Sequence, residues 1–361
     1  MAERVVVAMS GGVDSSVSAA LLHEQGYEVI GVTMKLWDGP ETPVAHHKTC
    51  CTLDDVSDAR RVATSLGIPF YVVNFKAQFA QHVIDYFVDT YRQGATPNPC
   101  VQCNRYLKFT ALVQRAQQLG ARWVATGHYA AVWQDQAGRY YIRRGHDTSK
   151  DQSYFLFDLS QEQLQYTLLP LGSYRKEEVR QIAVRLGLKV AEKPESQEIC
   201  FIPDGDYRSF VRPRLTPAEG QPGPMVHING TVVGRHQGLP FYTVGQRRGL
   251  GLAATEPLYV TRLDPVHNTV VVGPRPATLC ATFSVERVNW MCPPPAQTVH
   301  TTVQIRYRHQ PVAAAIHPVA SDRARIVLHE PQFAVTPGQA AVFYDGDTII
   351  GGGWITRSTP E

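Results

Sequence analysis

The residues best suited to chemistry lie near the start of the chain, in the stretch Ser10-Gly11-Gly12-Val13-Asp14-Ser15. This stretch follows the apolar run Val5–Met9, typical of a buried parallel strand, and precedes Val17–Gln25, which has the pattern of a helix. A glycine turn between a strand and a helix N-terminus presents backbone N–H groups and the positive end of the helix dipole to an anion. The stretch therefore predicts a phosphate-binding loop. No lysine follows it, which distinguishes it from a Walker A loop.

Three cysteines further along the chain offer thiol chemistry. Cys100 and Cys103 follow a proline-containing segment, and we expect a helix to begin at Asn104. Cys103 would then lie near a helix N-terminus, where a thiolate is favoured. The Cys-x-x-Cys spacing fits a redox pair, half of a metal site, or two buried structural cysteines. Cys200 lies between apolar residues, a pattern that also fits a core cysteine.

A cluster of His46, His47, Cys50 and Cys51 invites a zinc interpretation. Adjacent ligands of this kind rarely complete one tetrahedron, and no second ligand pair follows at a usual distance. We therefore expect a mobile loop over the active site rather than a metal site.

The elements that must position these groups alternate between strand and helix in the first half of the chain. This alternation predicts a doubly wound parallel sheet with both faces covered. Ligands bind beyond the carboxyl ends of such strands, which places Ser10–Ser15, Met34 and Gly127-His128 along one edge. Further strands are expected at Tyr27–Met34, Phe70–Asn74 and Trp123–Thr126, and helices at Thr52–Gly67, Lys76–Gln93, Asn104–Leu119 and Ser173–Gly187.

The second half of the chain is rich in β-strand patterns. Asn229-Gly230 is a strong two-residue hairpin signal. Six short strand patterns after residue 280 predict a small barrel. In the expected strand Thr298–Tyr307, Arg306 and Arg308 would share one face. We therefore expect three domains: a catalytic domain at 1–205, a small β-rich domain at 206–278 and a β-barrel at 279–361.

Composition sets broader limits. The chain has 361 residues, 43% of them apolar, and a formal net charge of +3. No apolar run approaches the ~20 residues that a membrane span needs, and the N-terminus does not resemble a signal peptide. We expect a cytosolic protein without a membrane partner. The odd total of seven cysteines favours reactive or metal-binding thiols over a disulfide scaffold.

The loop at Ser10–Ser15 resembles the pyrophosphate loop, SGGxDS, of the ATP pyrophosphatase superfamily. The chain as a whole resembles one branch of that superfamily, the bacterial tRNA-specific 2-thiouridylases. The matching motifs are SGGVDSSV, LGIP, TPNPxxxCNxxxKF, ATGHYA, KDQSYFL and SQEICFI, with further similar pieces at Gly245–Gly251, Gln304–Arg308 and Pro337–Tyr344.

This resemblance implies an adenine nucleotide alpha hydrolase-like fold and a specific reaction. ATP, with Mg²⁺, would adenylate O2 of the wobble uridine in the anticodon arm of tRNA. Sulfur from a cysteine persulfide would then replace that oxygen, giving 2-thiouridine, AMP and pyrophosphate. A sulfur carrier fed by a cysteine desulfurase would supply the persulfide. Cys200 would carry the persulfide, and Cys103 would be the nucleophile that attacks it or joins Cys200 in a disulfide.

The resemblance also assigns binding residues. Those for ATP are Ala8, Met9, Ser10, Gly11, Gly12, Val13, Asp14, Ser15, Met34 and Gly127. Those for the target base, which would be flipped out of its stack, are Asn98, Pro99 and Cys100. Those for the rest of the tRNA are His128, Lys150, Asp151, Gln152, Arg306, Tyr307 and Gln339.

The chain departs from this family at Cys100, where an aspartate is common. A thiol is a different acid, so the proposed acid–base role of that aspartate does not carry over. Cys100, Cys103 and Cys200 could instead hold a 4Fe–4S cluster with one open iron. Two other functions stay open: an ATP pyrophosphatase acting on a small molecule, and a non-catalytic tRNA-binding module.

Overall fold

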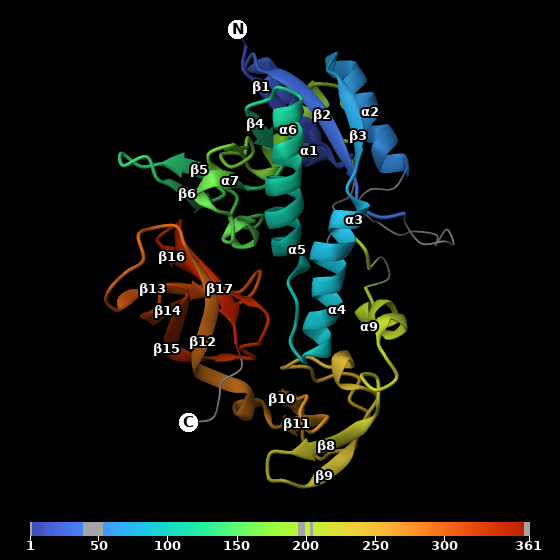
Figure 1. The fold of residues 1–361 in the computed structure, drawn as a ribbon, viewed down its shortest axis with the longest axis vertical. Coiled ribbons are helices and arrows are strands. Elements are labelled where there is room, and N and C mark those ends of the chain that lie inside the picture. Colours follow the sequence, from blue (N-terminus) through green and yellow to red (C-terminus); the bar gives the residue numbers. More distant parts are fainter. Residues whose placement is uncertain (1, 39–52, 194–198, 203–204, 357–361) are drawn as a thin grey trace. The chain divides into compact units, whose positions relative to one another are not determined.

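The computed structural model describes residues 2–38, 53–193, 199–202 and 205–356. The cluster between His46 and Cys51 lies outside these described residues. The chain divides into two compact units, which are considered separately (Figure 1). The first contains residues 1–83, 100–205 and 347–349, and the second contains residues 84–99, 206–346 and 350–361.

The first unit contains the predicted parallel sheet. Its strand order is β3-β2-β1-β4-β7, and each neighbouring pair is parallel. The middle of the central strand is buried, with Val5, Val6 and Val7 each 0% exposed. The doubly wound α/β prediction is therefore confirmed. The strands are β1 (Arg4–Ala8), β2 (Glu28–Lys35), β3 (Phe70–Asn74), β4 (Trp123–Ala125) and β7 (Thr167–Leu168).

Helices cover this sheet and contribute to its core. Buried side chains of α1, α2 and α8 pack with the strands in one apolar cluster. Among the described residues, no helix is long and apolar enough to cross a membrane. The helices of this group are α1 (Val13–Glu24), α2 (Leu53–Leu66) and α8 (Lys176–Arg185).

Two longer helical runs contain π-helical turns. One comprises α3 (Lys76–Phe79), η1 (Ala80–Ile84) and α4 (Asp85–Arg92), as predicted for Lys76–Gln93. The other comprises α5 (Pro99–Gln102), η2 (Cys103–Ala111) and α6 (Leu112–Gln118). This second run begins at Pro99, so the prediction that it begins at Asn104 is wrong. Proline is favoured at the first helical position, where its missing N–H has no partner to lose.

A hairpin in the first unit was not predicted. It joins β5 (Ala130–Gln134) to β6 (Tyr140–Arg144) in an antiparallel pair. The short elements η3 (Ser153–Leu156) and α7 (Gln161–Leu164) follow. Ser160 caps α7, because its hydroxyl accepts a hydrogen bond from the backbone N–H of Gln163.

After α4, the second unit continues at residue 206 with short helices and a four-stranded sheet of order β10-β11-β8-β9. The predicted hairpin at Asn229-Gly230 joins β8 to β9 and is confirmed. The elements are α9 (Tyr207–Val211), η4 (Arg212–Arg214), β8 (Gly223–His227), β9 (Val232–His236), η5 (Leu239–Phe241), β10 (Tyr259–Asp264), β11 (Thr269–Gly273) and η6 (Arg275–Thr278).

The remaining strands form the predicted barrel. Their order is β12-β15-β14-β13-β16-β17, and a further pairing of β12 with β17 closes it. The barrel and the four-stranded sheet have separate apolar cores, and we propose a domain boundary between them near residue 278. The strands are β12 (Leu279–Trp290), β13 (Val299–Gln304), β14 (Val312–Ala320), β15 (Arg323–Phe333), β16 (Ala340–Asp345) and β17 (Thr348–Ile355).

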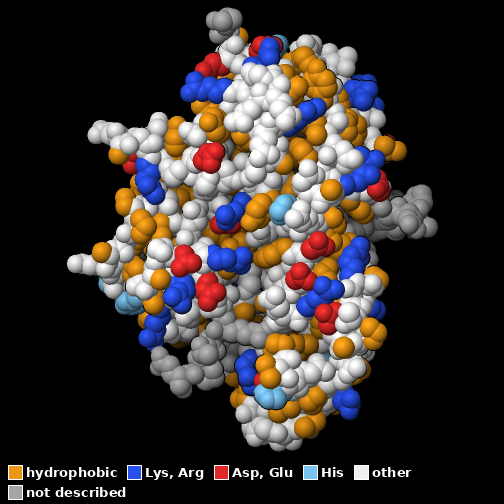
Figure 2. All heavy atoms as spheres, in the orientation of Figure 1, with side chains coloured by type: hydrophobic (Ala, Val, Ile, Leu, Met, Phe, Trp, Pro, Cys, Tyr) orange, Lys and Arg blue, Asp and Glu red, His pale blue; other side chains and the backbone are white. Residues whose placement is uncertain are grey.

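Strand β13 is shorter than predicted. It ends at Gln304, and Arg306–His309 form a turn in which the His309 N–H donates to the Arg306 carbonyl at 3.1 Å. Arg308 has a φ of +61°, which no extended strand residue adopts. The prediction that Arg306 and Arg308 share one face of a strand is therefore wrong. Lysine and arginine side chains are dispersed among acidic ones on the face drawn in Figure 2.

Candidate active site

The predicted phosphate loop joins β1 to α1, and hydrogen bonds within it fix its shape. The Ser15 hydroxyl accepts from the Ser10 N–H at 3.1 Å and donates to the Gly12 carbonyl at 3.2 Å. Gly11 has a φ of +73°, and a Cβ there would lie 2.2 Å from the Asp55 carbonyl oxygen. Only glycine fits this position. Gly12 is the N-cap of α1, so the loop presents that helix N-terminus to an anion.

Residues at the ends of three parallel strands lie at the same edge of the sheet as this loop. Met9 lies between β1 and the loop, where its N–H donates to Val32 and its carbonyl accepts from Thr33. Met34 lies near the end of β2. Gly127 follows β4, and a Cβ there would lie 2.8 Å from both the Asp14 carbonyl carbon and the Ser15 nitrogen. The structure thus brings Gly127 together with the loop at the carboxyl edge of the sheet, where nucleotide sites occur.

Two lysines that sequence reasoning missed also contact the loop. Lys176 of α8 places its Nζ 2.7 and 2.8 Å from the two carboxylate oxygens of Asp14. The Tyr129 hydroxyl donates to the same carboxylate at 2.7 Å. Both contacts hold the Asp14 side chain from outside the loop. The Lys176 side chain is 9% exposed and the Asp14 side chain is 31% exposed, so this ion pair is partly buried.

The second missed lysine is Lys193. Its Nζ donates to the Gly11 carbonyl at 3.0 Å and pairs with Asp55 at 2.7 Å and Asp58 at 2.6 Å. Burial alone would lower the pKa of Lys193, but the hydrogen bonds to the two carboxylates outweigh it and raise that pKa. Lys193 is therefore charged and ties the phosphate loop to α2. Lys193 lies 182 residues after Gly11, so no local sequence pattern could predict this contact.

Cys103 and Cys200 lie on two segments that both contact the helical run formed by α3 and η1. Cys103 is the first residue of η2, and Cys100 is exposed in the preceding helix α5. The Tyr106 ring on η2 stacks on His82 of η1, with ring centroids 4.5 Å apart. π-Helical turns of this kind often occur at functional sites.

Cys200 lies in a turn attached to the same helical run. The Phe201 ring packs edge-on against Phe79 of α3, with centroids 5.6 Å apart. Phe201 and Ile202 are each 2% exposed, whereas Cys200 is only partly buried. The neighbours of Cys200 anchor the turn, so the thiol is not a core residue.

The predicted iron–sulfur alternative needs three thiols gathered around one point. Among the described residues, no group of three or more His, Cys, Asp or Glu side chains is placed to hold a metal ion. Cys100, Cys103 and Cys200 therefore do not form a cluster site in this structure, and we derive no step through an iron–sulfur cluster.

His128 lies against the helix that carries Cys103. Its Nδ1 is 2.6 Å from the Thr126 hydroxyl, and its Nε2 is 3.4 Å from Lys108 Nζ. Burial disfavours the imidazolium, and the Lys108 charge adds to this effect, so the pKa of His128 lies well below its usual value. His128 is therefore neutral near pH 7.

Asp151 and Gln152 have structural partners. The Asp151 carboxylate accepts from Arg144 at 2.7 Å, from the Gly145 N–H at 3.1 Å, and from both the N–H and hydroxyl of Ser153. Gln152 exchanges hydrogen bonds with the Tyr129 backbone. These contacts fix the turn before η3, with Lys150 at its start. Their assignment to tRNA stays a prediction.

In the second unit, the segment before Pro99 is held by the barrel. The Gln339 amide donates to the carbonyls of Thr96 and Pro97 at 3.2 and 3.0 Å. The Asn98 N–H donates to the Tyr86 hydroxyl at 3.4 Å. Gln339, predicted to contact tRNA, thus positions the expected target-base segment. Arg306 donates to the Phe333 carbonyl at 3.0 Å, and Tyr307 follows it in the turn.

Comparison with protein-family models divides the chain into three matched regions. Residues 3–204 match a family described as "tRNA methyl transferase HUP domain". Residues 208–274 match "tRNA methyl transferase PRC-barrel domain", and residues 280–355 match "Aminomethyltransferase beta-barrel domain". These matches begin and end close to the structural divisions described above.

Curated relatives match over nearly the whole chain. A protein of Geotalea uraniireducens, named "tRNA-specific 2-thiouridylase MnmA", is 52% identical over 99% of this chain and 96% of that protein. Proteins of the same name from Geobacter metallireducens and Heliobacterium modesticaldum are 51% and 53% identical. The matches cover 99% of this chain in both cases, and 98% and 94% of the relatives.

Gly127→Ala tests the close approach at the phosphate loop. The added methyl would meet main-chain atoms, which cannot move as a side chain can. Overpacking of this kind destabilises the folded chain by about 1–3 kcal/mol, so we expect the unfolding free energy to fall by that amount. We also expect the displaced loop to bind ATP more weakly, as measured by calorimetry. Gly220→Ala is the control, because a Cβ there meets only one atom, at 3.9 Å. Equal ATP affinities in the two variants would contradict the packing argument.

His128 gives a prediction about pH. Below the ordinary histidine pKa of about 6.5, the unfolded chain takes up a proton at this position that the folded chain does not, so folded stability falls as pH falls. His128→Asn should flatten the decline in unfolding free energy between about pH 6.5 and 5, by at most about 1.4 kcal/mol per pH unit. His146→Asn, which removes an exposed imidazole, is the matched control for the substitution. Parallel curves for wild type and His128→Asn would refute the assignment of a buried neutral histidine.

Proposed function

Because the chain belongs to the tRNA-specific 2-thiouridylase family, we propose that it replaces O2 of the wobble uridine of tRNA with sulfur in an ATP-dependent reaction. The observation that carries this proposal is the joint presence, in one compact unit, of a glycine-built phosphate loop and two thiol segments attached to one helical run. A nucleotide-binding protein without sulfur chemistry would not need the second feature.

We propose that Ala8–Ser15, Met34 and Gly127 bind ATP in the first step. The loop N–H groups and the α1 N-terminus would stabilise the charge of the phosphates. Uridine O2 would attack the α-phosphorus, forming an O–P bond while pyrophosphate leaves. The adenylated oxygen is then a good leaving group, and C2 becomes electrophilic. Mg²⁺ would accompany ATP, and no step here depends on protein ligands for it.

In the second step, Cys200 would carry a persulfide whose terminal sulfur forms the bond to C2 as AMP leaves. Cys103 thiolate can attack the Cys200 sulfur, which breaks its S–S bond to the transferred sulfur and leaves a Cys103–Cys200 disulfide. An external thiol reductant would then restore both thiols. Alternatively, Cys103 attack on the persulfide would release sulfide first, and that sulfide would attack C2.

This reaction needs two partners, the tRNA that carries the target uridine and a protein that donates sulfur. The target base would lie against Asn98, Pro99 and Cys100, and the remaining contacts to the anticodon arm would come from His128, Lys150–Gln152, Arg306, Tyr307 and Gln339. A carrier protein supplied by a cysteine desulfurase would reload Cys200. We propose that the protein acts in the cytoplasm, where these partners occur.

The descriptions of two matching family models mention methyl transfer instead. Thiolation is favoured because relatives that match nearly the whole chain at 51–52% identity are named as 2-thiouridylases. The two reactions are also distinguishable by mass, since one exchanges oxygen for sulfur and the other adds a methylene.

Cysteine variants test the proposal directly. The protein is incubated with unmodified tRNA, ATP, Mg²⁺ and a persulfide donor, and the digested nucleosides are identified by mass spectrometry. We expect 2-thiouridine from wild type, and at least about a hundredfold less from Cys103→Ser and Cys200→Ser. Both variants should still bind ATP, because neither thiol belongs to the phosphate loop.

Two further variants serve as controls in this assay. Cys280→Ser, in the barrel, should retain thiolation. Cys100→Ser should also retain most of it if the persulfide route operates, whereas an iron–sulfur route requires Cys100 and predicts its loss. ATP consumption by wild type without any thiolated nucleoside would contradict the proposal and favour a small-molecule substrate.

A further inference from the structure

The loop between η5 and β10 has no role in the reaction described above. It contains Gly245–Gly251, one of the segments on which the family resemblance rests. A cavity of about 460 Å³ lies against this loop, and residues between Arg247 and Leu258 form its walls. Gly249 and Gly251 have φ values of +73° and +68°, which glycine adopts without steric cost. The cavity is therefore built by the main chain of one loop.

Hydrogen bonds and apolar contacts fix the shape of this loop. The Gln246 side chain accepts from the Thr243 N–H at 3.1 Å and donates to the Arg248 carbonyl at 3.0 Å. Leu250 is 7% exposed and belongs to the apolar core beneath the loop, and Leu252 packs against that core. The loop is therefore shaped before a ligand arrives, which lowers the entropic cost of binding one.

The main chain of the loop offers hydrogen-bond donors that the protein does not use. Within the part of the chain that the structure describes, the N–H groups of residues 247–256 have no hydrogen-bond partner. Successive N–H groups in a turn with left-handed residues form concave sites that bind anions. The unused donors therefore favour an anion over a cation or an apolar ligand.

Arginine side chains lie at or beside the same cavity. Arg247 lines it, Arg248 follows, and both are exposed. Neither forms an ion pair with another described residue. Arg208 of α9 approaches from outside the loop, because two of its guanidinium nitrogens would lie 3.6 and 3.7 Å from a Cβ at Gly249. Guanidinium groups bind phosphate through paired hydrogen bonds, so these side chains fit the anion that the main chain favours.

One acidic side chain, Glu256, also lines the cavity. It is exposed, so solvent and salt screen its repulsion of an anion. The surrounding charge is positive, because residues 206–278 contain eight arginines, no lysine and four acidic residues, a formal charge of +4. The whole chain carries only +3, so this domain supplies the positive excess of the protein. Such a charge favours a polyanionic partner.

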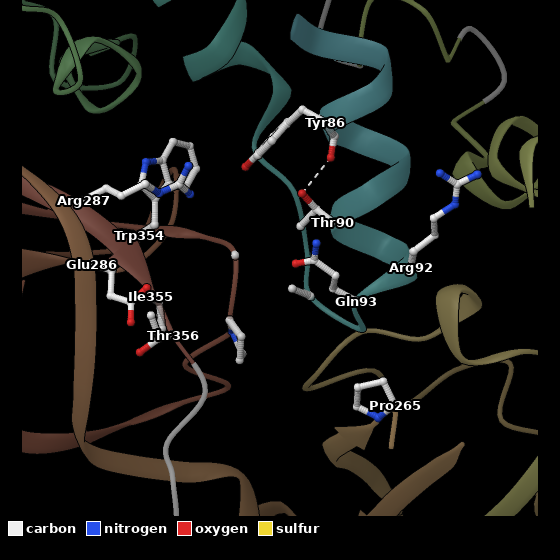
Figure 3. Close-up of a pocket in the computed structure, with 13 residues that line it drawn as sticks. Tyr86, Thr90, Arg92, Gln93, Pro265, Glu286, Arg287, Trp354, Ile355 and Thr356 are labelled. Atoms are coloured by element: carbon white, nitrogen blue, oxygen red, sulfur yellow. Dashed lines mark hydrogen bonds between the residues drawn. The ribbon is translucent and has the colours of Figure 1, made fainter. Parts of the chain in front are cut away.

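A larger cavity of the second unit, of about 540 Å³, also contains arginines, but their surroundings differ (Figure 3). Arg92 forms ion pairs with Asp89 at 2.6 Å and with Glu219 at 3.2 Å. Arg287 lies at a β-bulge in the pairing of β12 with β17, and its guanidinium carbon is 5.3 Å from the centre of the Trp354 ring. The arginines of that cavity thus have partners within the protein, whereas those of the loop after Gln246 are available to a ligand.

We propose that the loop at residues 247–256, together with Arg208, binds a backbone phosphate of tRNA. This inference rests on the proposed function for the identity of the RNA. The two non-bridging oxygens of a phosphodiester accept hydrogen bonds from main-chain N–H groups and from guanidinium groups alike. A contact of this kind carries no base preference, and it positions the RNA on the second unit.

Binding of fluorescently labelled, unmodified tRNA to the full-length protein tests the proposal without requiring turnover. We expect Arg247→Gln to raise the Kd about tenfold, in the range of one lost hydrogen bond to a charged group. The slope of log affinity against log salt concentration should become shallower by about 1, because one phosphate is no longer neutralised. Arg235→Gln removes an exposed arginine of β9 outside the cavity and should bind within about twofold of wild type.

Three further variants separate a built site from a simple positive charge. Gln246→Leu removes the two hydrogen bonds that shape the loop but no charge, and we expect it to raise the Kd about three- to tenfold. Arg247→Lys should bind within about threefold of wild type, because a phosphate also accepts a point charge. Glu256→Gln removes the repelling carboxylate and should lower the Kd about twofold.

Ethylation of tRNA phosphates identifies the one that is bound. Each ethyl group neutralises one phosphate, and ethylated positions that block binding are read by sequencing the bound and free fractions. At least one such position should block binding of wild type but not of Arg247→Gln, because both changes remove the same contact. Arg235→Gln should retain the wild-type pattern.

Several results would overturn the proposal. Equal weakening by Arg247→Gln and Arg235→Gln would indicate general electrostatics, and equal weakening by Arg247→Gln and Arg247→Lys would indicate a base contact. Identical ethylation patterns for wild type and Arg247→Gln would exclude a phosphate contact at this loop. Formation of 2-thiouridine with tRNA affinity unchanged in every loop variant would contradict this inference alone. Absence of 2-thiouridine with the expected binding pattern intact would instead contradict only the proposed function.

Discussion

Main-chain packing around Asp14 is the constraint on which the phosphate loop depends. Gly11 and Gly127 let two backbone segments approach the loop more closely than any side chain would permit. The Asp14 carboxylate is then fixed by Lys176 and Tyr129, and Lys193 ties Gly11 to α2. The loop near the N-terminus is therefore complete only when residues up to 193 have folded around it. A single βα unit would not hold this geometry.

A similar arrangement positions the proposed target-base segment. Thr96–Asn98 lacks regular structure, and its carbonyl and N–H groups bond to Gln339, Pro337 and Tyr86. Buried main-chain groups outside helices and sheets need such partners. The barrel therefore acts as a support for this segment.

The sequence predicted the features that have a local physical cause. Continuous β-branched runs identified the buried parallel strands, and the Asn-Gly pair identified a hairpin. Features set by tertiary contacts were missed. Lys176 and Lys193 reach the loop from far along the chain, and the bulge at Arg287 arises from pairing with β17. Pro97 and Pro99 suggested a break, although Pro99 begins a helix.

The proposed reaction depends on activation by ATP of the uridine oxygen that sulfur replaces. The most direct test uses tRNA whose wobble uridine carries heavy oxygen at O2, together with ATP and a persulfide donor. Mass spectrometry of the products then follows the heavy atom. We expect the heavy oxygen to appear in AMP, in proportion to the 2-thiouridine formed. Heavy oxygen released into water or retained in the tRNA, with 2-thiouridine still formed, would contradict it.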